Sequence, residues 1–318
     1  MNTKVQLALL IACIFSQTAI WSQERVIQVT SERNEDKSMS FSCAKNEFGT
    51  YYLELWFTDL ENAYSSGYKG NIDVANRDFL QVKPINNNRP INCTYRTWYI
   101  RGELDPKFDP AFSYLLPLSC GKPVKVRFMS YLNSKYFGAE SPKNWHAYQF
   151  VANPGDTVYS ARKGTVVKIE DDNEYKTDFT VLYQSTINKI TIEHPDGTLA
   201  EYSGFKGNEI WVKEGETVYP HSPLGVLAQY DKETAQLRFK IFYLDEIPVS
   251  KNRQDKLNDK FQYYSYVEPH FLTESGMQSL ENGESYTGLV NEEIILKEFS
   301  KKELRQLKKG EINLPDSE

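Results

Sequence analysis

The sequence has few of the side chains that bind transition metals, with four histidines and four cysteines among 318 residues. The histidines form no His-x-His or His-x-x-x-His pair, and the cysteines form no Cys-x-x-Cys pair. Zinc sites draw imidazole, thiolate and carboxylate ligands to one point, commonly from such short spacings. The Gly-x-Ser-x-Gly pattern of serine hydrolases is absent as well. The sequence therefore has no local motif for metal-dependent or nucleophilic catalysis.

Long apolar runs and excess positive charge are also missing. After residue 22 there is no run of roughly 18 or more apolar residues, which predicts no integral membrane segment in the rest of the chain. The formal net charge is −6, with acidic and basic residues interspersed, and this balance gives no reason to expect nucleic acid as a partner. Three cysteines follow residue 22, at Cys43, Cys93 and Cys120. Two of them could form a disulfide in an exported protein, but the spacing does not identify the pair.

The first 22 residues have the pattern of a secretory signal peptide. Lys4 precedes an apolar run over residues 5–15, and small or polar residues follow as far as Ser22, so we expect cleavage near Ser22 and Gln23. A lipobox reading of residues 10–13, with Cys13 acylated, is the alternative. Apolar residues continue beyond that cysteine, which favours the first interpretation. We expect an exported protein of the periplasm or cell surface.

Residues 23–130 predict a β-sandwich of the immunoglobulin-like type. Aromatic residues make up 14% of the chain, which favours strands. Leu53, Leu55 and Phe57 alternate with Tyr52 and Glu54, as in a strand with one buried face. Turn-forming clusters separate five strand candidates, at residues 41–45, 50–57, 79–84, 94–101 and 124–129.

The next part of the chain contains an internal repeat about sixty residues apart. The segment GDTVYSARKGTVV at 155–167 resembles GETVYPHSPLGVL at 215–227. We expect two related hairpins, each with a second glycine in a tight turn that needs positive φ. Between them, residues 189–202 predict a further hairpin around the Asp196-Gly197 turn. The pattern indicates a compact β-barrel or folded sheet.

With these landmarks, residues 140–247 resemble the lysostaphin-type or LytM domain. The resemblance rests on PGDTVYSARKGTVV, IEHPDGTLAEYS, VKEGETVYPHSPLGVL and LRFKIFY, which follow in that order over roughly the middle third of the chain. Members of that family are zinc endopeptidases that cut peptide cross-links of the bacterial cell wall. Together with the sandwich, this resemblance gives a mainly β chain with a sandwich over residues 23–130, a LytM-type domain over residues 140–247 and an extension over residues 248–318.

The same resemblance locates a candidate site, in which the family's zinc-binding and catalytic groups are replaced. The replaced positions hold Trp145, Gln149, Gly204, Gln236 and Arg238. His146 follows Trp145, which holds the position of the first ligand. A shift of one residue along a strand turns the side chain to the opposite face of the sheet. Indole, carboxamide, hydrogen and guanidinium groups bind zinc poorly or not at all. The resemblance therefore implies a degenerate copy without a cofactor.

The former metal cleft could instead be a polar groove that binds peptide carbonyls, sugar hydroxyls or a carboxylate. The candidate binding residues are His146, Gln149, Tyr202, Gln236 and Arg238. The alternative is that Arg238 pairs with a nearby acid and the two glutamines fill space.

A short helix is predicted near the end of the chain, over residues 300–309. Ser300 and Glu303 can form a capping box, and Gly310 can end the helix. For the whole chain we expect a non-catalytic envelope protein that binds cell-wall peptide or another envelope protein, and regulation of a wall hydrolase is a further hypothesis. One alternative is an active zinc endopeptidase with His146 and His194 among its ligands, the only case that requires zinc. Another is a structural subunit of an envelope complex.

Overall fold

The computed structural model describes residues 25–131, 142, 144–172, 187–231, 233–245 and 263–312. The predicted signal peptide and Cys13 lie outside these residues. The chain is mainly β, as expected, with two short helices described near its C-terminal end. None of the helices in the described ranges is long and apolar enough to cross a membrane.

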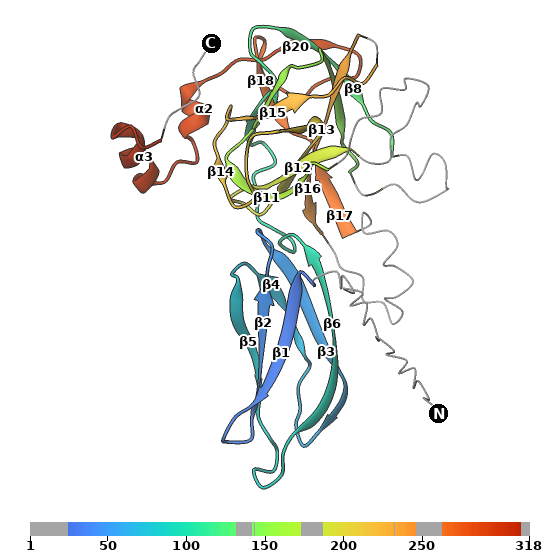
Figure 1. Ribbon diagram of the computed structural model, residues 1–318, viewed down its shortest axis with the longest axis vertical. Helices are drawn as coiled ribbons and strands as arrows, with labels where there is room; N and C mark the ends of the chain where they lie inside the picture. Colours follow the sequence, from blue (N-terminus) through green and yellow to red (C-terminus); the bar gives the residue numbers. More distant parts are fainter. Residues whose placement is uncertain are drawn as a thin grey trace, which may run out of the picture.

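The first six strands form two three-stranded antiparallel sheets, ordered β1-β2-β5 and β4-β3-β6 (Figure 1). Their bounds are β1 Ile27–Arg33, β2 Met39–Lys45, β3 Tyr51–Glu61, β4 Tyr68–Ile72, β5 Asn76–Val82 and β6 Asn92–Arg101. The sheets pack face to face, because Cys43 of one and Leu53 of the other belong to one buried cluster, and Phe41 and Leu55 share a second. This is the predicted β-sandwich, and its immunoglobulin-like type stays a prediction.

Cys43, Cys93 and Cys120 are all free thiols. Cys43 is buried in the sandwich core, and Cys93 lies 3.7 Å from the Met39 sulfur. Two buried apolar clusters form the core of the sandwich, and Cys43 belongs to one of them as a thiol.

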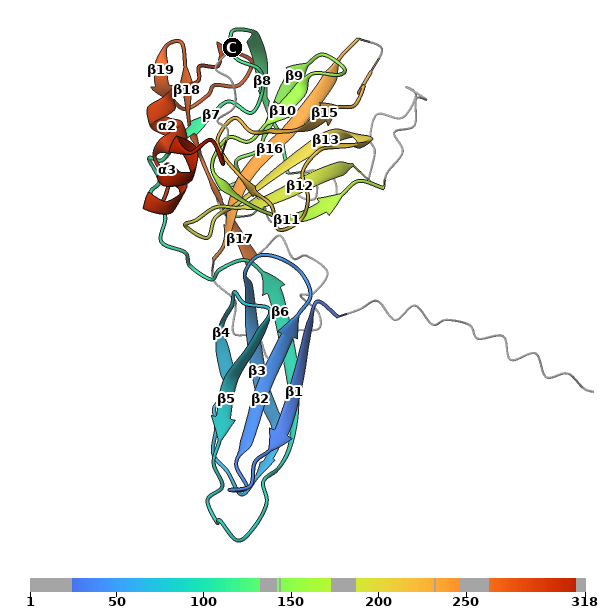
Figure 2. The ribbon, with the colours of Figure 1, turned by 60° about the vertical axis from the view of Figure 1, so that its left-hand side comes forward.

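A second, larger sheet of eleven strands has the main order β14-β11-β12-β13-β16-β9-β8-β20, and Figure 2 shows several of these strands side by side. Its bounds are β8 Pro123–Phe128, β9 Tyr148–Ala152, β10 Thr157–Tyr159, β11 Gly164–Glu170, β12 Asn188–Glu193, β13 Leu199–Ile210, β14 Thr217–Val218, β15 Pro223–Leu227, β16 Ala235–Leu244, β17 Tyr264–Val267 and β20 Ser285–Thr287. A small sheet, β19-β18-β7, packs against its core. The remaining elements are β7 Ser113–Leu115, β18 His270–Thr273, β19 Gly276–Gln278, α2 Glu292–Leu296 and α3 Lys301–Lys308.

The placement of the strand predicted at 124–129 was wrong. The pattern predicts it in the sandwich, but it is β8 and pairs with β9 and β20 of the large sheet. Val124 and Val126 are buried in the same cluster as Phe150. An alternating pattern identifies the buried face of a strand, but it does not say which sheet covers that face.

The expectation of two separate repeat hairpins was also wrong. The two segments pair with each other, β10 with β15 and β11 with β14. Gly155 and Gly215 have φ of 84° and 87°, as a turn glycine does. Gly164 instead allows close packing, because a Cβ there would lie 2.4 Å from a methyl carbon of Ile192.

Two local predictions are confirmed. Strands β12 and β13 form the expected antiparallel hairpin, and Gly197 in its turn has φ of 84°. Helix α3 begins with the predicted capping box, in which Ser300 and Glu303 bond reciprocally. It ends before Gly310, whose φ is 73°. These features depend on neighbours in sequence, which explains why sequence alone located them.

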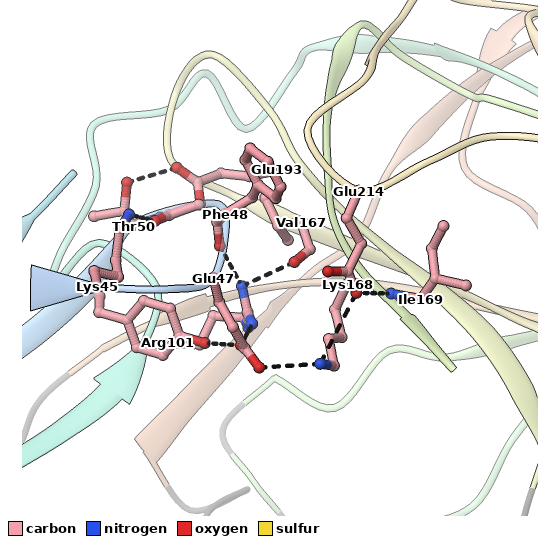
Figure 3. A network of polar contacts seen from close by, with 12 residues as sticks. Lys45, Glu47, Phe48, Thr50, Arg101, Val167, Lys168, Ile169, Glu193 and Glu214 are labelled. Carbon is pink, nitrogen blue, oxygen red and sulfur yellow. Dashed lines mark hydrogen bonds and ion pairs between the residues drawn. The ribbon is translucent and has the colours of Figure 1, made fainter. Parts of the chain in front are cut away.

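The sandwich contacts the large sheet through a network of polar groups (Figure 3). Thr50 donates its backbone N–H and its hydroxyl to the Glu193 carboxylate, at 2.7 and 2.6 Å. Glu47 accepts a hydrogen bond from Lys168 at 3.0 Å and also binds Arg101. These contacts place the sandwich at the β11–β12 side of the sheet.

Candidate functional site

A row of polar residues crosses four neighbouring strands of the large sheet. Arg127 of β8 pairs with Gln149 of β9, Gln149 with Arg238 of β16, and Arg238 with Ser203 of β13. Residues that pair directly in antiparallel strands point to the same face of the sheet. Their neighbours along the strands are core residues on the opposite face, namely Val126, Tyr148, Phe150, Tyr202, Leu237 and Phe239. We call Arg127, Gln149, Arg238 and Ser203 the arginine row.

The long side chains of the arginine row have no polar partner within the described chain. Arg127 is exposed, while Gln149 and Arg238 are half-buried. Among the described residues, none of these three side chains forms a hydrogen bond or an ion pair. The expected alternative, an acid that neutralises Arg238, has no counterpart in the described ranges. The row therefore presents hydrogen-bond donors and two fixed positive charges.

The charges beside this row are paired: Lys189 and Glu170 continue it beyond Ser203 on β12 and β11, and Glu201 lies opposite Lys240 in the next row. The Glu201 carboxylate lies 2.9 Å from the Lys240 ammonium and 3.7 Å from that of Lys189, which also reaches Glu170 at 3.2 Å. Burial opposes ionisation of Glu201, but the two lysines outweigh it and hold the pKa of Glu201 below its ordinary value. Glu201, which is diagonal to Arg238, is thus already engaged by two cations.

Gln236 lies on the same face as Arg238, two residues earlier on β16, and its Cα partner is Val151. The neighbouring strand approaches it closely at Gly204, where φ is 118°. A Cβ at this position would lie 2.3 Å from the Gln236 carbonyl oxygen. The backbone therefore excludes a side chain at the position where the resemblance places a catalytic histidine.

Two of the predicted site residues lie apart from the arginine row. Tyr202 is 0% exposed and faces the core, and its hydroxyl accepts a hydrogen bond from the Ala161 N–H at 2.9 Å. His146 precedes β9, with Nδ1 2.9 Å from the Asn144 carbonyl and Nε2 3.6 Å from the Glu268 carboxylate. The structure thus brings together Gln149, Gln236 and Arg238 but not Tyr202 or His146.

Trp145, at the other replaced ligand position, packs in an aromatic cluster. Its ring centroid lies 4.6 Å from that of Tyr266 and 5.0 Å from that of Tyr131. Its indole N–H donates to the Met129 carbonyl at 2.6 Å. The indole is therefore a packing group and not a member of the row.

Sequence reasoning missed a buried ionic cluster around Arg162, whose side chain is 3% exposed. The guanidinium donates to Glu298 at 2.6 and 2.9 Å, to Asp196 at 2.7 Å and to the Tyr114 hydroxyl at 3.1 Å. It also lies 3.6 Å from the centre of the Phe112 ring. Arg162 and Glu298 are 136 residues apart, and no local motif could have predicted their pairing.

The same cluster anchors the C-terminal helices to the sheet domain. Lys163 donates to the Glu303 carboxylate of α3 at 2.8 Å, and the rings of Tyr219 and Phe299 lie 4.6 Å apart. Burial opposes ionisation of Glu303, but bonds from Lys163 and Ser300 lower its pKa to about 2. Helices α2 and α3 are therefore held by charge pairs as well as by packing.

His194 belongs to this region and not to the arginine row. It is 2% exposed, and its Nδ1 lies 2.9 Å from the Thr198 hydroxyl. Burial and the positive charge of Arg162 hold the pKa of His194 far below its ordinary value, so the imidazole is neutral. Among the residues that the structure describes, no three His, Cys, Asp or Glu side chains converge as a metal site requires.

No family model matches the sequence, and no curated protein matches it either. The structure is similar to a Ruminococcus gnavus protein that bears the name of a glycyl-glycine endopeptidase, LytM. The identity is 14% over 41% of this chain and 52% of that chain, with a TM-score of 0.27. This chain thus spans about half the length of that protein.

Two further solved structures show similarity at the same level. Pseudoalterin, a deep-sea M23 metalloprotease, is 15% identical over 57% of this chain and 99% of its own, with a TM-score of 0.31. Helicobacter pylori Csd3 is 11% identical over 68% of this chain and 70% of its own, with a TM-score of 0.28. At these scores the similarities do not assign the chain to a family.

Proposed function

We propose that the chain is an exported, non-catalytic protein of the bacterial cell envelope, and that the arginine row faces its ligand. One observation carries the proposal: Arg238 lies directly opposite Gln149, at the two positions where the LytM resemblance places zinc ligands. A guanidinium is a permanent cation that repels a divalent metal, and a carboxamide is a weak ligand for zinc. Both groups are good hydrogen-bond donors to a peptide or a carboxylate.

The backbone at Gly204 supports the same conclusion. Only glycine fits there, because a Cβ would overlap the Gln236 carbonyl oxygen. Restoring a histidine would require β13 to move away from β16 as well as a change of side chain. The departure from the catalytic pattern therefore involves the backbone and not the side chains alone.

No observation favours the zinc endopeptidase alternative with His146 and His194 as ligands. His194 is buried beside Thr198, whereas His146 lies next to Glu268. The two imidazoles share no contact with a common residue in the described ranges. Sedimentation with isolated cell wall distinguishes a structural-subunit role from wall binding.

The test is sedimentation of the purified chain with isolated cell wall, with soluble wall fragments measured in the supernatant. We expect the chain to sediment with the wall and to release no fragments above the blank. Arg238→Gln should weaken sedimentation, whereas Arg96→Gln, at an exposed arginine on the sandwich strand β6, should not. Release of wall peptides would overturn the non-catalytic proposal. Failure to sediment, with stable co-purification of one protein partner, would favour the structural role.

Regulation of a wall hydrolase is a further part of this proposal. It predicts that the chain changes the rate at which a hydrolase from the same cell releases wall fragments. Arg238→Gln should reduce that effect in proportion to its loss of wall binding, while Arg96→Gln should retain it.

A further inference from the structure

The charged groups on this face of the large sheet are paired around Glu201 but unpaired beside Gln149. Lys240 and Lys189 both form ion pairs with the Glu201 carboxylate, and Lys189, which lies opposite Ser203 at the end of the arginine row, also reaches Glu170. In the arginine row, Arg127 and Arg238 flank Gln149 without a carboxylate partner among the described residues. Charged groups at one row of a sheet are normally paired or left to water. The unpaired row is therefore the part of this face that is free to bind an anion.

The spacing of the row suits a small planar anion. Arg127 and Arg238 are two strands apart, so their Cα atoms are separated by roughly 10 Å. Both side chains are long enough to converge on a group above Gln149, which can donate its amide N–H between them. Lys125, two residues before Arg127 on β8, adds a third cation to the same face. Arginine binds carboxylate with two parallel N–H donors, and such charge-assisted bonds are the strong ones.

The glutamines favour a peptide carboxylate over a phosphate. A phosphate offers mainly acceptor oxygens and at most one or two O–H donors, so it matches the carbonyl halves of Gln149 and Gln236 less well. A peptide presents backbone N–H donors next to its carboxylate, and these match the two carboxamide oxygens. Gln236 lies on the same face as the row, two residues before Arg238 on β16.

We propose that the arginine row is a carboxylate-binding site in which Arg127 and Arg238 bind the free carboxylate of a peptide and Gln149 and Gln236 bind its adjacent amide groups. This deepens the proposed function, because it assigns the chemical class of the ligand at that surface. Arg238 would then bind the carboxylate with its permanent positive charge, at a position where the resemblance places a metal ligand.

The test uses a matched pair of probes, the tetrapeptide Gly-Gly-Ala-Ala with a free C-terminal carboxylate and the same peptide as its C-terminal amide. Binding is measured by NMR titration of the full chain, following the arginine side-chain Nε–H signals. We expect the free acid to bind at least about tenfold more tightly than the amide, a difference typical of one charge-assisted pair. Arg238→Gln and Arg127→Gln should each remove that preference, whereas Arg96→Gln should keep it. Circular dichroism confirms that the three variants are folded.

Each outcome decides one question. Equal binding of the acid and the amide, or no effect of Arg127→Gln and Arg238→Gln, would overturn the carboxylate site. Tighter binding of inorganic phosphate than of the acid, with the same dependence on both arginines, would overturn the choice of carboxylate. The proposed function is tested separately with isolated wall whose carboxyl groups have been amidated. Loss of wall binding on amidation supports both proposals, and equal binding to amidated and untreated wall leaves wall binding standing but refutes the carboxylate site.

Discussion

Replacement of Arg162 by methionine should be among the most destabilising single changes in the sheet domain. The methionine side chain fills much of the same volume, so the substitution removes charge and donors more than packing. It leaves Glu298 and Asp196, whose side chains are 15% and 14% exposed, without their shared cation. It also removes the cation above the Phe112 ring.

The magnitude follows from the burial of the cluster. Removing one member of a buried ion pair costs about 3–5 kcal/mol, because the remaining charge is left uncompensated. For a domain of this size each kcal/mol lowers Tm by about 2–4 °C, so the expected fall is roughly 6–20 °C. The Lys163–Glu303 pair remains, which should keep part of α3 in place.

Differential scanning calorimetry measures this effect as the shift in the unfolding temperature. The matched control is Lys206→Ala, which removes an exposed pair with Glu209. Such pairs contribute about 0–1 kcal/mol. A fall in Tm for Arg162→Met no larger than that of the control would refute the view that the cluster anchors the C-terminal helices.

Three further predictions concern the domain contact, pH and backbone. Glu193→Ala should leave the backbone N–H and the hydroxyl of Thr50 unpaired, which lowers the free energy of unfolding by about 1–3 kcal/mol. Proteolysis between the sandwich and the sheet should become faster, and an unchanged cleavage rate would contradict this. Because His194 is neutral when folded, stability should fall as pH drops below about 6.5, where the unfolded chain takes up a proton. Urea titrations at several pH values should show a shallower slope for His194→Gln, and an equal slope would refute the assignment. Gly204→Ala should lower Tm more than Gly155→Ala, since both have positive φ but only Gly204 meets the Gln236 carbonyl.

The sequence allowed prediction of elements whose signals are local. Strands β2, β3, β5 and β6 follow from alternation and turn residues, and the cap of α3 follows from Ser300 and Glu303. Pairing between distant strands has no such signal. The repeats predicted positive φ at their second glycines, which Gly225 has and Gly164 lacks, and they did not predict that each repeat pairs with the other.

The candidate site was predicted in part, for a related reason. Order and spacing of motifs located Gln149, Gln236 and Arg238, which the sheet does bring to one face. Arg127 was missed because its strand was assigned to the sandwich. Tyr202 was placed by motif alone, and its hydroxyl bonds in the core to Ala161. The face of the sheet that a side chain occupies, and its burial, depend on which strands pair. No single segment of the sequence contains that information.

Metal content shows whether the arginine row binds its ligand without zinc. The chain is incubated with zinc, freed of excess metal on a desalting column and measured by mass spectrometry of the elements. We expect a zinc content well below one atom per chain, unchanged by Gln149→Ala. One zinc atom per chain that is lost on substitution of Gln149 or Arg238 would contradict it.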